Sequence, residues 1–208
     1  MRLGIIGPNG VGKSTLSKLL AAHYQCPLVE EPVISNPYLP YFYKDKDTFS
    51  FLAQNAFYSA LFLEMWKAKD LPHVIFDSTM YSNLVYTELL RLEGFMNAKE
   101  VALTYAIADE HIRRLPTIDI TLILLRPKDA LFRNVASRGR AIEKDQSDYL
   151  NFHYDHYEDV IRIIFKNYKV PAEDILYLTL NDVYQPAEFN RVVKLIEDAY
   201  QRKLGLKK

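Results

Sequence analysis

Short apolar runs and longer stretches of helical periodicity alternate along the chain. The apolar runs are rich in Ile, Leu and Val and have the length of strands that are buried on both faces. The segments between them repeat apolar residues every three or four positions, which predicts crossover helices. The alternation therefore predicts a parallel sheet, with strands at residues 3–6, 27–29, 73–76, 120–125 and 175–178.

The helical segments have recognisable ends. Gly94 stands where a helix should stop, and Asn97 followed by Glu100 resembles a capping box. Pro116 should end the helix that begins there. We expect helices at residues 14–24, 48–69, 81–93, 97–115, 128–137, 147–168 and 187–204, and hence an α/β fold with a five-stranded parallel sheet flanked by helices.

One predicted helix is apolar on more than one face. Its sequence, FSFLAQNAFYSALFLEMW, carries bulky residues all around the helix axis. Such a helix lies at the centre of a core or buries a second face against another subunit. We therefore expect a homodimer.

Composition narrows the class of protein. A chain of 208 residues, 49% of them apolar, suits one domain, residues 1–208. The 26 basic and 26 acidic side chains cancel, which argues against nucleic-acid or anionic-membrane partners and favours a small molecule. The single cysteine, Cys26, cannot form an intramolecular disulfide, and no apolar run approaches the length of a membrane span. The phosphate-loop pattern begins at residue 7 and leaves no room for a cleavable signal before it, so we expect a cytoplasmic protein.

The first chemical motif is G-x-x-x-x-G-K-S, between the first predicted strand and helix. Its glycines allow backbone N–H groups to wrap an anion at the positive end of a helix. Lys13 would reach the β and γ phosphates of ATP, and Ser14 would bind Mg²⁺. The expected nucleotide-binding residues are Gly7, Asn9, Gly10, Val11, Gly12, Lys13, Ser14 and Thr15.

The sequence GPNGVGKST is also common in the phosphate loops of transporter-type ATPases. Those proteins need a Ser-Gly-Gly signature and an acidic residue directly after the aspartate of the strand VIFD. This sequence has no Gly-Gly pair, and Ser78 follows Asp77. The transporter interpretation is therefore rejected.

The remaining landmarks resemble the deoxynucleoside kinase family, particularly the bacterial deoxyadenosine and deoxyguanosine kinases. They occur in the family's order from the phosphate loop to about Tyr157. The matching stretches are EEPVISNPYL, FYKDKDTFSFLAQ, VIFDSTMYSN, LLRLEGFMNAKE, PTIDITLILLRP, RGRAIE and YLNFHYDHYEDVI.

The resemblance implies a set of catalytic residues. Glu31 would accept the proton of the 5′-hydroxyl, and Asp77 would help Ser14 to hold Mg²⁺. The family's arginine lid, here about residues 133–146, would close over the phosphates. The catalytic residues are then Glu31, Lys13, Arg138 and Arg140.

The resemblance also implies a nucleoside pocket. Tyr43 and Glu143 match the pair that holds the sugar 3′-hydroxyl, and Glu31 lies at the 5′ side. Gln54 and Asn83 match polar positions that read the base, and an amide offers both a donor and an acceptor. The implied activity is ATP-dependent 5′-phosphorylation of a deoxyribonucleoside, with purines slightly favoured.

Three positions depart from the family's pattern. Ser78 stands where many members have an arginine, Leu61 where an arginine often lies against the base, and Asn134 where a lid arginine is usual. Ser78 and Leu61 leave one alternative open, a nucleotide-binding regulatory protein that has lost turnover. The other alternative is a nucleoside monophosphate kinase of the same fold, which would need an extra basic residue facing the substrate's own phosphate; NPYLPYFY and FLAQNAFYSALF supply none.

Overall fold

Five strands form one sheet in which every pair of neighbours is parallel, in the order β2–β3–β1–β4–β5. The computed structural model describes residues 1–33, 35–138 and 146–205. Each predicted strand is present within a residue or so of its expected bounds, and the fold class is confirmed. The strands are β1 (Arg2–Ile6), β2 (Leu28–Val29), β3 (Val74–Asp77), β4 (Ile120–Leu125) and β5 (Ile175–Thr179).

All the predicted helices are present as well. Two short elements, α2 and the 3₁₀ helix η2, were not predicted, because four and three residues are too few to show a helical period. The helices are α1 (Lys13–Tyr24), α2 (Leu39–Phe42), α3 (Lys46–Lys67), α4 (Met80–Leu92), α5 (Ala98–Arg114), α6 (Lys128–Arg138), α7 (Ser147–Asn167), η2 (Ala172–Asp174) and α8 (Pro186–Gly205).

Side-chain caps start α3 and α5, and a glycine follows the end of α4. The Asn97 side chain accepts from the Glu100 amide at 3.1 Å, and the Glu100 carboxylate accepts from the Asn97 amide at 2.9 Å, so the predicted capping box is confirmed. Gly94 has φ +88° just beyond α4, as a helix stop requires. Asp45 accepts from the Thr48 amide at 3.1 Å, which starts α3 two residues earlier than expected.

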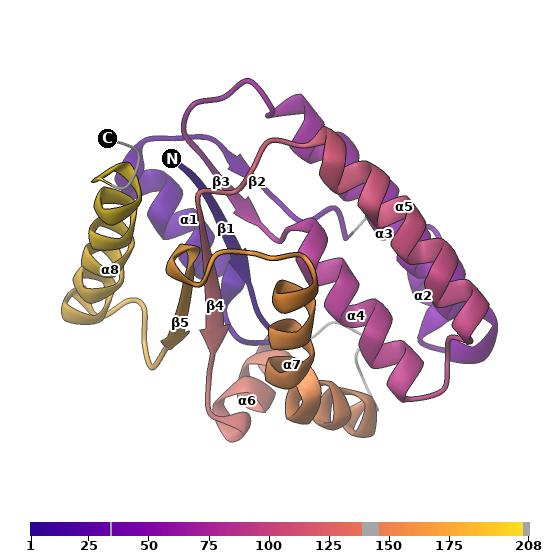
Figure 1. Ribbon diagram of the computed structural model, residues 1–208. Helices are drawn as coiled ribbons and strands as arrows, with labels where there is room; N and C mark the ends of the chain where they lie inside the picture. Colours follow the sequence, from indigo (N-terminus) through magenta and orange to yellow (C-terminus); the bar gives the residue numbers. More distant parts are fainter. Residues whose placement is uncertain (34, 139–145, 206–208) are drawn as a thin grey trace.

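Helices cover both faces of the sheet (Figure 1). Alternate strand residues face opposite layers, so Ile75 joins the core with Leu16 and Leu20 of α1, whereas its neighbour Phe76 joins the core with Leu84 of α4. Each such side chain contributes about 1.5–3 kcal/mol on burial. In Figure 1, α1 and α8 lie on one side of the sheet, and α3, α4, α5 and α7 lie on the other.

The strand order determines where a ligand can bind. From β1 at the centre, the chain adds β2 and β3 on one side and β4 and β5 on the other. In such sheets, a crevice opens at the carboxyl ends of the strands where the order reverses. Among the described residues, no helix is both long and apolar enough to cross a membrane.

Candidate active site

The phosphate-loop motif forms the turn between β1 and α1, as predicted. Gly12 has φ +106° and precedes Lys13, the first residue of α1. The Lys13 ammonium is buried and donates to the carbonyl oxygens of Gly7 at 2.9 Å and Pro8 at 3.4 Å. A bound triphosphate would offer that ammonium stronger, anionic acceptors.

The tip of this loop packs tightly against α6. Gly10 has φ +86°, and a Cβ atom there would lie 2.7 Å from Val135 Cγ2 and 2.9 Å from the carbonyl oxygen of Leu131. The Asn134 side chain donates to the Gly10 carbonyl at 2.9 Å. Asn134, at a usual arginine position of the family, therefore binds the phosphate loop of this protein.

Replacing Gly10 with alanine should destabilise the fold through both strain and contact. We expect the Gly10→Ala free energy of unfolding to fall by about 2–4 kcal/mol, since the positive φ and the clash with a helix backbone add. Gly94→Ala is the matched control, because Gly94 has φ +88° but a Cβ atom there would meet no atom of the described residues within 4 Å. The free energies of unfolding are measured by urea denaturation. Equal losses in the two variants would show that the contact with α6 does not contribute to the cost of the Gly10 substitution.

A cavity of about 720 Å³ opens beside the loop at the carboxyl edge of the sheet. It collects residues from β3, α1, α3, α4 and the segment after β2. Gly7 and Val11 are buried in the loop and do not line it. The predicted site residues that line the cavity are Asn9, Gly10, Gly12, Lys13, Ser14, Thr15, Glu31, Tyr43, Gln54, Asp77 and Asn83.

Asp77 is the last residue of β3 and is 3% exposed. Its Oδ1 atom is buried and has no hydrogen-bond partner among the described residues. A buried carboxylate oxygen without a donor suits a hard cation such as Mg²⁺, and the Ser14 hydroxyl lines the same cavity. The described residues contain no group of three or more His, Cys, Asp or Glu side chains arranged to hold a metal ion, so phosphates and water would supply the remaining ligands.

Ser78, directly after Asp77, has a strained backbone. Its φ is +119°, a region that residues other than glycine rarely enter, and its side chain is fully buried. Such a conformation costs about 1–3 kcal/mol, and strain of this kind clusters at functional sites. A small, buried serine therefore shapes the turn where many family members carry an arginine.

Two buried amides line the cavity away from the loop. Gln54 of α3 is 6% exposed and Asn83 of α4 is 4% exposed. Gln54 Oε1 and Asn83 Nδ2 have no hydrogen-bond partner in the part of the chain that the structure describes. Because leaving a buried polar group unpaired costs about 1–3 kcal/mol, both atoms are ready to bind a polar ligand. Leu61, by contrast, is 1% exposed and belongs to the core.

The two adjacent glutamates after β2 differ in their surroundings. Glu30 is exposed and pairs with Lys18 at 3.1 Å. Glu31 is half-buried and faces the cavity, as does the half-buried Tyr43. Glu30 and Lys18 line the cavity as well, so the direction of Glu30 relative to the reaction site stays a prediction.

The predicted lid lies partly outside the described residues. Arg138 ends α6, but its side chain is not described, and neither are Arg140 and Glu143. Arg133, at the start of the predicted lid, pairs with Asp129 at 2.6 Å on the surface.

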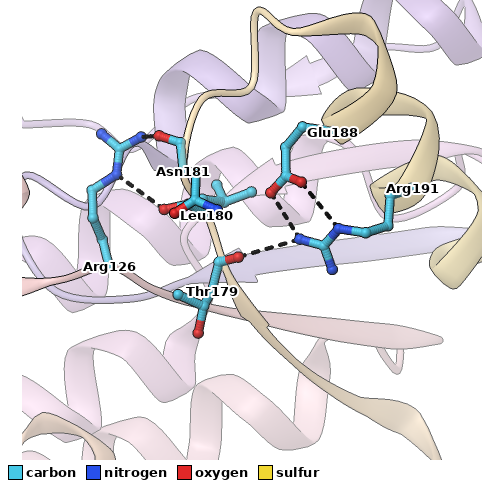
Figure 2. Close-up of polar contacts among 6 residues, drawn as sticks. All are labelled: Arg126, Thr179, Leu180, Asn181, Glu188 and Arg191. Atoms are coloured by element: carbon cyan, nitrogen blue, oxygen red, sulfur yellow. Dashed lines mark hydrogen bonds and ion pairs between the residues drawn. The ribbon is translucent and has the colours of Figure 1, made fainter.

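One end of the cavity was missed by the sequence analysis. Arg126, just after β4, and residues 181–184, just after β5, line it. Figure 2 shows how arginines hold this second segment: Arg126 donates to the carbonyl oxygens of Leu180 and Asn181, and Arg191 of α8 donates to that of Thr179 at 3.2 Å. Their place directly after two neighbouring strands is the signal that could have found them.

A buried histidine lies behind the cavity. His153 of α7 is 3% exposed, and its Nε2 atom is 2.7 Å from Glu93 Oε2. Burial lowers the pKa of His153 below its usual value. The charges of Lys46 and His156 lower this pKa further, whereas the hydrogen bond and charge of Glu93 raise it. A neutral imidazole must then carry its proton on Nε2, because a carboxylate accepts but cannot donate.

This lowered pKa predicts a stability loss in acid. The unfolded chain binds a proton at His153 near pH 6.5, whereas the folded chain binds it at lower pH. The stabilisation is therefore present above about pH 6.5 and is lost as the pH falls toward the folded pKa, with a slope of at most about 1.4 kcal/mol per pH unit. Urea denaturation from pH 7.5 to 5.5 should show a steeper loss for wild type than for His153→Gln; parallel curves would contradict the assignment.

Comparison with known proteins identifies the family. Residues 3–200 match the sequence profile of the deoxynucleoside kinases. A deoxyguanosine kinase of Bacillus subtilis is 26% identical over 166 residues, covering 77% of this chain and 78% of that protein. A deoxyguanosine kinase of Dictyostelium discoideum is 30% identical over 147 residues, covering 66% of this chain, which spans about half (50%) of that relative's length.

The fold agrees with these matches. The structure of a deoxyadenosine kinase from M. mycoides superimposes with a TM-score of 0.78 and 22% sequence identity, covering 95% of this chain and 100% of the other. At this identity the likeness shows the fold, and the match over residues 3–200 shows the family. The resemblance expected from the sequence is therefore confirmed, and this chain belongs to the deoxynucleoside kinase family.

Proposed function

We propose that this protein is a cytoplasmic kinase that transfers the γ-phosphoryl group of ATP to the 5′-hydroxyl of a deoxyribonucleoside, with purines slightly favoured. One observation carries the proposal: a phosphate loop, a half-buried glutamate and two buried amides with unpartnered atoms line the same cavity. Phosphoryl transfer to a sugar hydroxyl needs this combination of donor site, base and polar pocket. The family's activity supports it.

The reaction requires a base at the hydroxyl and positive charge at the phosphates. Glu31 accepts the proton as the hydroxyl oxygen bonds to the γ-phosphorus and the bond to the β–γ bridging oxygen of ADP breaks. Lys13, Arg138 and Arg140 stabilise the charge on the transferring group. When bound, Mg²⁺ neutralises phosphate charge, and Ser14 and Asp77 are the residues that would hold it.

The acceptor pocket uses neutral polar groups. Tyr43 and Glu143 bind the sugar 3′-hydroxyl, while Gln54 and Asn83 bind the edge of the base. An amide can present either its oxygen or its nitrogen to a neighbour, so the pair suits the mixed donors and acceptors of a purine edge.

The base of ATP would lie at the other end of the cavity. Arg126 offers a flat guanidinium that stacks on aromatic rings, and the segment of residues 181–184 offers backbone groups. Because Arg126 donates to the carbonyl oxygens of Leu180 and Asn181, the two walls are held together before the nucleotide binds (Figure 2).

The active form would be a homodimer that pairs α3 and α5 of two chains. Both helices expose large apolar side chains on the surface of one chain. They are Leu52, Leu63 and Trp66 on α3, and Leu103 and Ile107 on α5. Because α3 and α5 pack side by side, these exposed side chains suit an interface between two subunits.

A product analysis tests the proposal. The purified protein is incubated with Mg-ATP and, separately, with each of four deoxynucleosides and four monophosphates, and the products are separated by chromatography. The proposal predicts monophosphates from one or more deoxynucleosides. Product from monophosphates alone would identify a nucleoside monophosphate kinase, and binding of ATP without product would identify a regulatory protein; either result contradicts the proposal.

A further inference from the structure

A chain of side-chain contacts connects the phosphate loop with the opposite wall of the cavity. The Tyr86 hydroxyl of α4 donates to Asn9 Oδ1 in the loop at 3.0 Å. The Tyr86 ring centroid lies 5.6 Å from that of His153, which lies 3.9 Å from that of Tyr149. Tyr86 and Tyr149 both line the cavity, whereas His153 lies behind them.

Helix geometry explains why these side chains meet. Tyr149 and His153 are four residues apart on α7 and share one helix face. Glu93 is the C-cap residue of α4 and still has helical backbone angles, so it lies on the same side as Tyr86, seven residues earlier. The 2.7 Å contact between His153 and Glu93 then joins the two helices. Neither residue has a part in the phosphoryl transfer proposed above.

The surroundings of His153 leave it little freedom. Its side chain is 4% exposed and that of Glu93 is 12% exposed, so water competes weakly for their hydrogen bond. On its other side, Tyr149 faces the Lys46 ammonium, 5.2 Å from the ring centroid, and Lys46 also donates to Gln146 at 2.6 Å. The ring of Tyr149 is thus held between two fixed groups.

We infer that His153 is a positioning residue: anchored by Glu93, it fixes the rings of Tyr149 and Tyr86 and, through the Tyr86 hydroxyl, the Asn9 side chain of the phosphate loop. The inference rests on the proposed function, because it assigns Tyr149 to the nucleoside wall and Asn9 to the nucleotide site. A single buried pair then orders both substrate sites.

The predicted signature is a change in KM rather than in turnover. His153→Phe keeps an aromatic ring but loses the hydrogen bond, and should raise KM for the deoxynucleoside about tenfold, as expected for loss of a hydrogen bond to a charged group. KM for ATP should rise about threefold, the effect of a weakened neutral hydrogen bond at Asn9. The kcat value should change less than twofold.

Three further variants separate positioning from folding. His153→Gln keeps a donor for Glu93 and should restore both KM values to within twofold of wild type. Tyr86→Phe removes the link to Asn9 alone, and should raise KM for ATP but not for the deoxynucleoside. If His153→Phe does not fold, the double variant Glu93→Leu/His153→Phe replaces the pair by apolar groups and should show the same KM increases.

The matched control is His156→Phe, which changes an exposed histidine on the same helix and should leave both KM values unchanged. Unaltered KM values in His153→Phe, with a lower melting temperature, would reduce the pair to a structural role and overturn the inference. Failure of His153→Gln to restore the KM values would overturn it as well.

The affinity for Mg-ATP, measured by calorimetry, tests the positioning role of His153 independently of kinase activity. If wild type phosphorylates no deoxynucleoside, the proposed function fails, and the inference is judged on whether His153→Phe and Tyr86→Phe each weaken Mg-ATP binding about threefold. If wild type is active and its Mg-ATP affinity matches that of both variants, the inference alone fails.

Discussion

Replacing Glu31 with glutamine should lower the turnover of a deoxynucleoside by about 10²–10⁴-fold, the usual contribution of a general base. The amide keeps the size of the side chain but cannot accept the proton of the 5′-hydroxyl. Because Glu31 is half-buried at the cavity and lies outside any helix or strand, the fold should be unaffected. Steady-state rates of ADP formation measure the effect.

Glu30→Gln is the control for this variant. It changes the adjacent, exposed glutamate, whose ion pair with Lys18 is worth at most about 1 kcal/mol. Its turnover should stay within twofold of wild type. If turnover fell equally in both variants, the loss would come from a disturbed local backbone and not from a missing base, which would contradict the role of Glu31.

The second large effect is expected at Lys13. Lys13→Met removes the ammonium but keeps an apolar stem, and should lower kcat by about 10²–10³-fold, the loss typical of one group that stabilises transition-state charge. The ammonium donates to the carbonyl oxygens of Gly7 and Pro8, so its loss also loosens the phosphate loop and should raise KM for ATP. Initial rates over a series of Mg-ATP concentrations separate the two effects.

Lys18→Met is the control for this variant, since Lys18 lies on the same helix but is exposed and pairs with Glu30. It should retain nearly full activity. A Lys13→Met enzyme that keeps wild-type kcat would show that the loop binds nucleotide without taking part in the transfer.

Local patterns made much of this site predictable. The phosphate loop is contiguous in sequence, and its glycines need the positive φ values that the structure shows at Gly10 and Gly12. Asp77 could be located because parallel strands end at one edge of a sheet. Gln54 is a polar residue in an otherwise apolar helix, whereas Asn83 was predicted only through the resemblance to the family.

Features that depend on distant contacts were not predictable from one sequence. Arg126 contacts residues more than 50 positions away because β4 pairs with β5, a neighbourhood that periodicity does not specify. Glu93 and His153 are 60 residues apart and meet because α4 packs on α7. No local turn signal in the sequence marks the φ of +119° at Ser78.

The central claim is that this cavity transfers a phosphoryl group to a deoxynucleoside, and a single-turnover reaction tests it most directly. Excess protein is mixed with ATP labelled in the γ-phosphate, Mg²⁺ and the deoxynucleoside that gives most product, and the labelled species are separated with time. The label should pass to the deoxynucleoside 5′-monophosphate in wild type, and far more slowly in Glu31→Gln. Label that appears as inorganic phosphate alone, or transfer at the same rate in both proteins, would contradict the account.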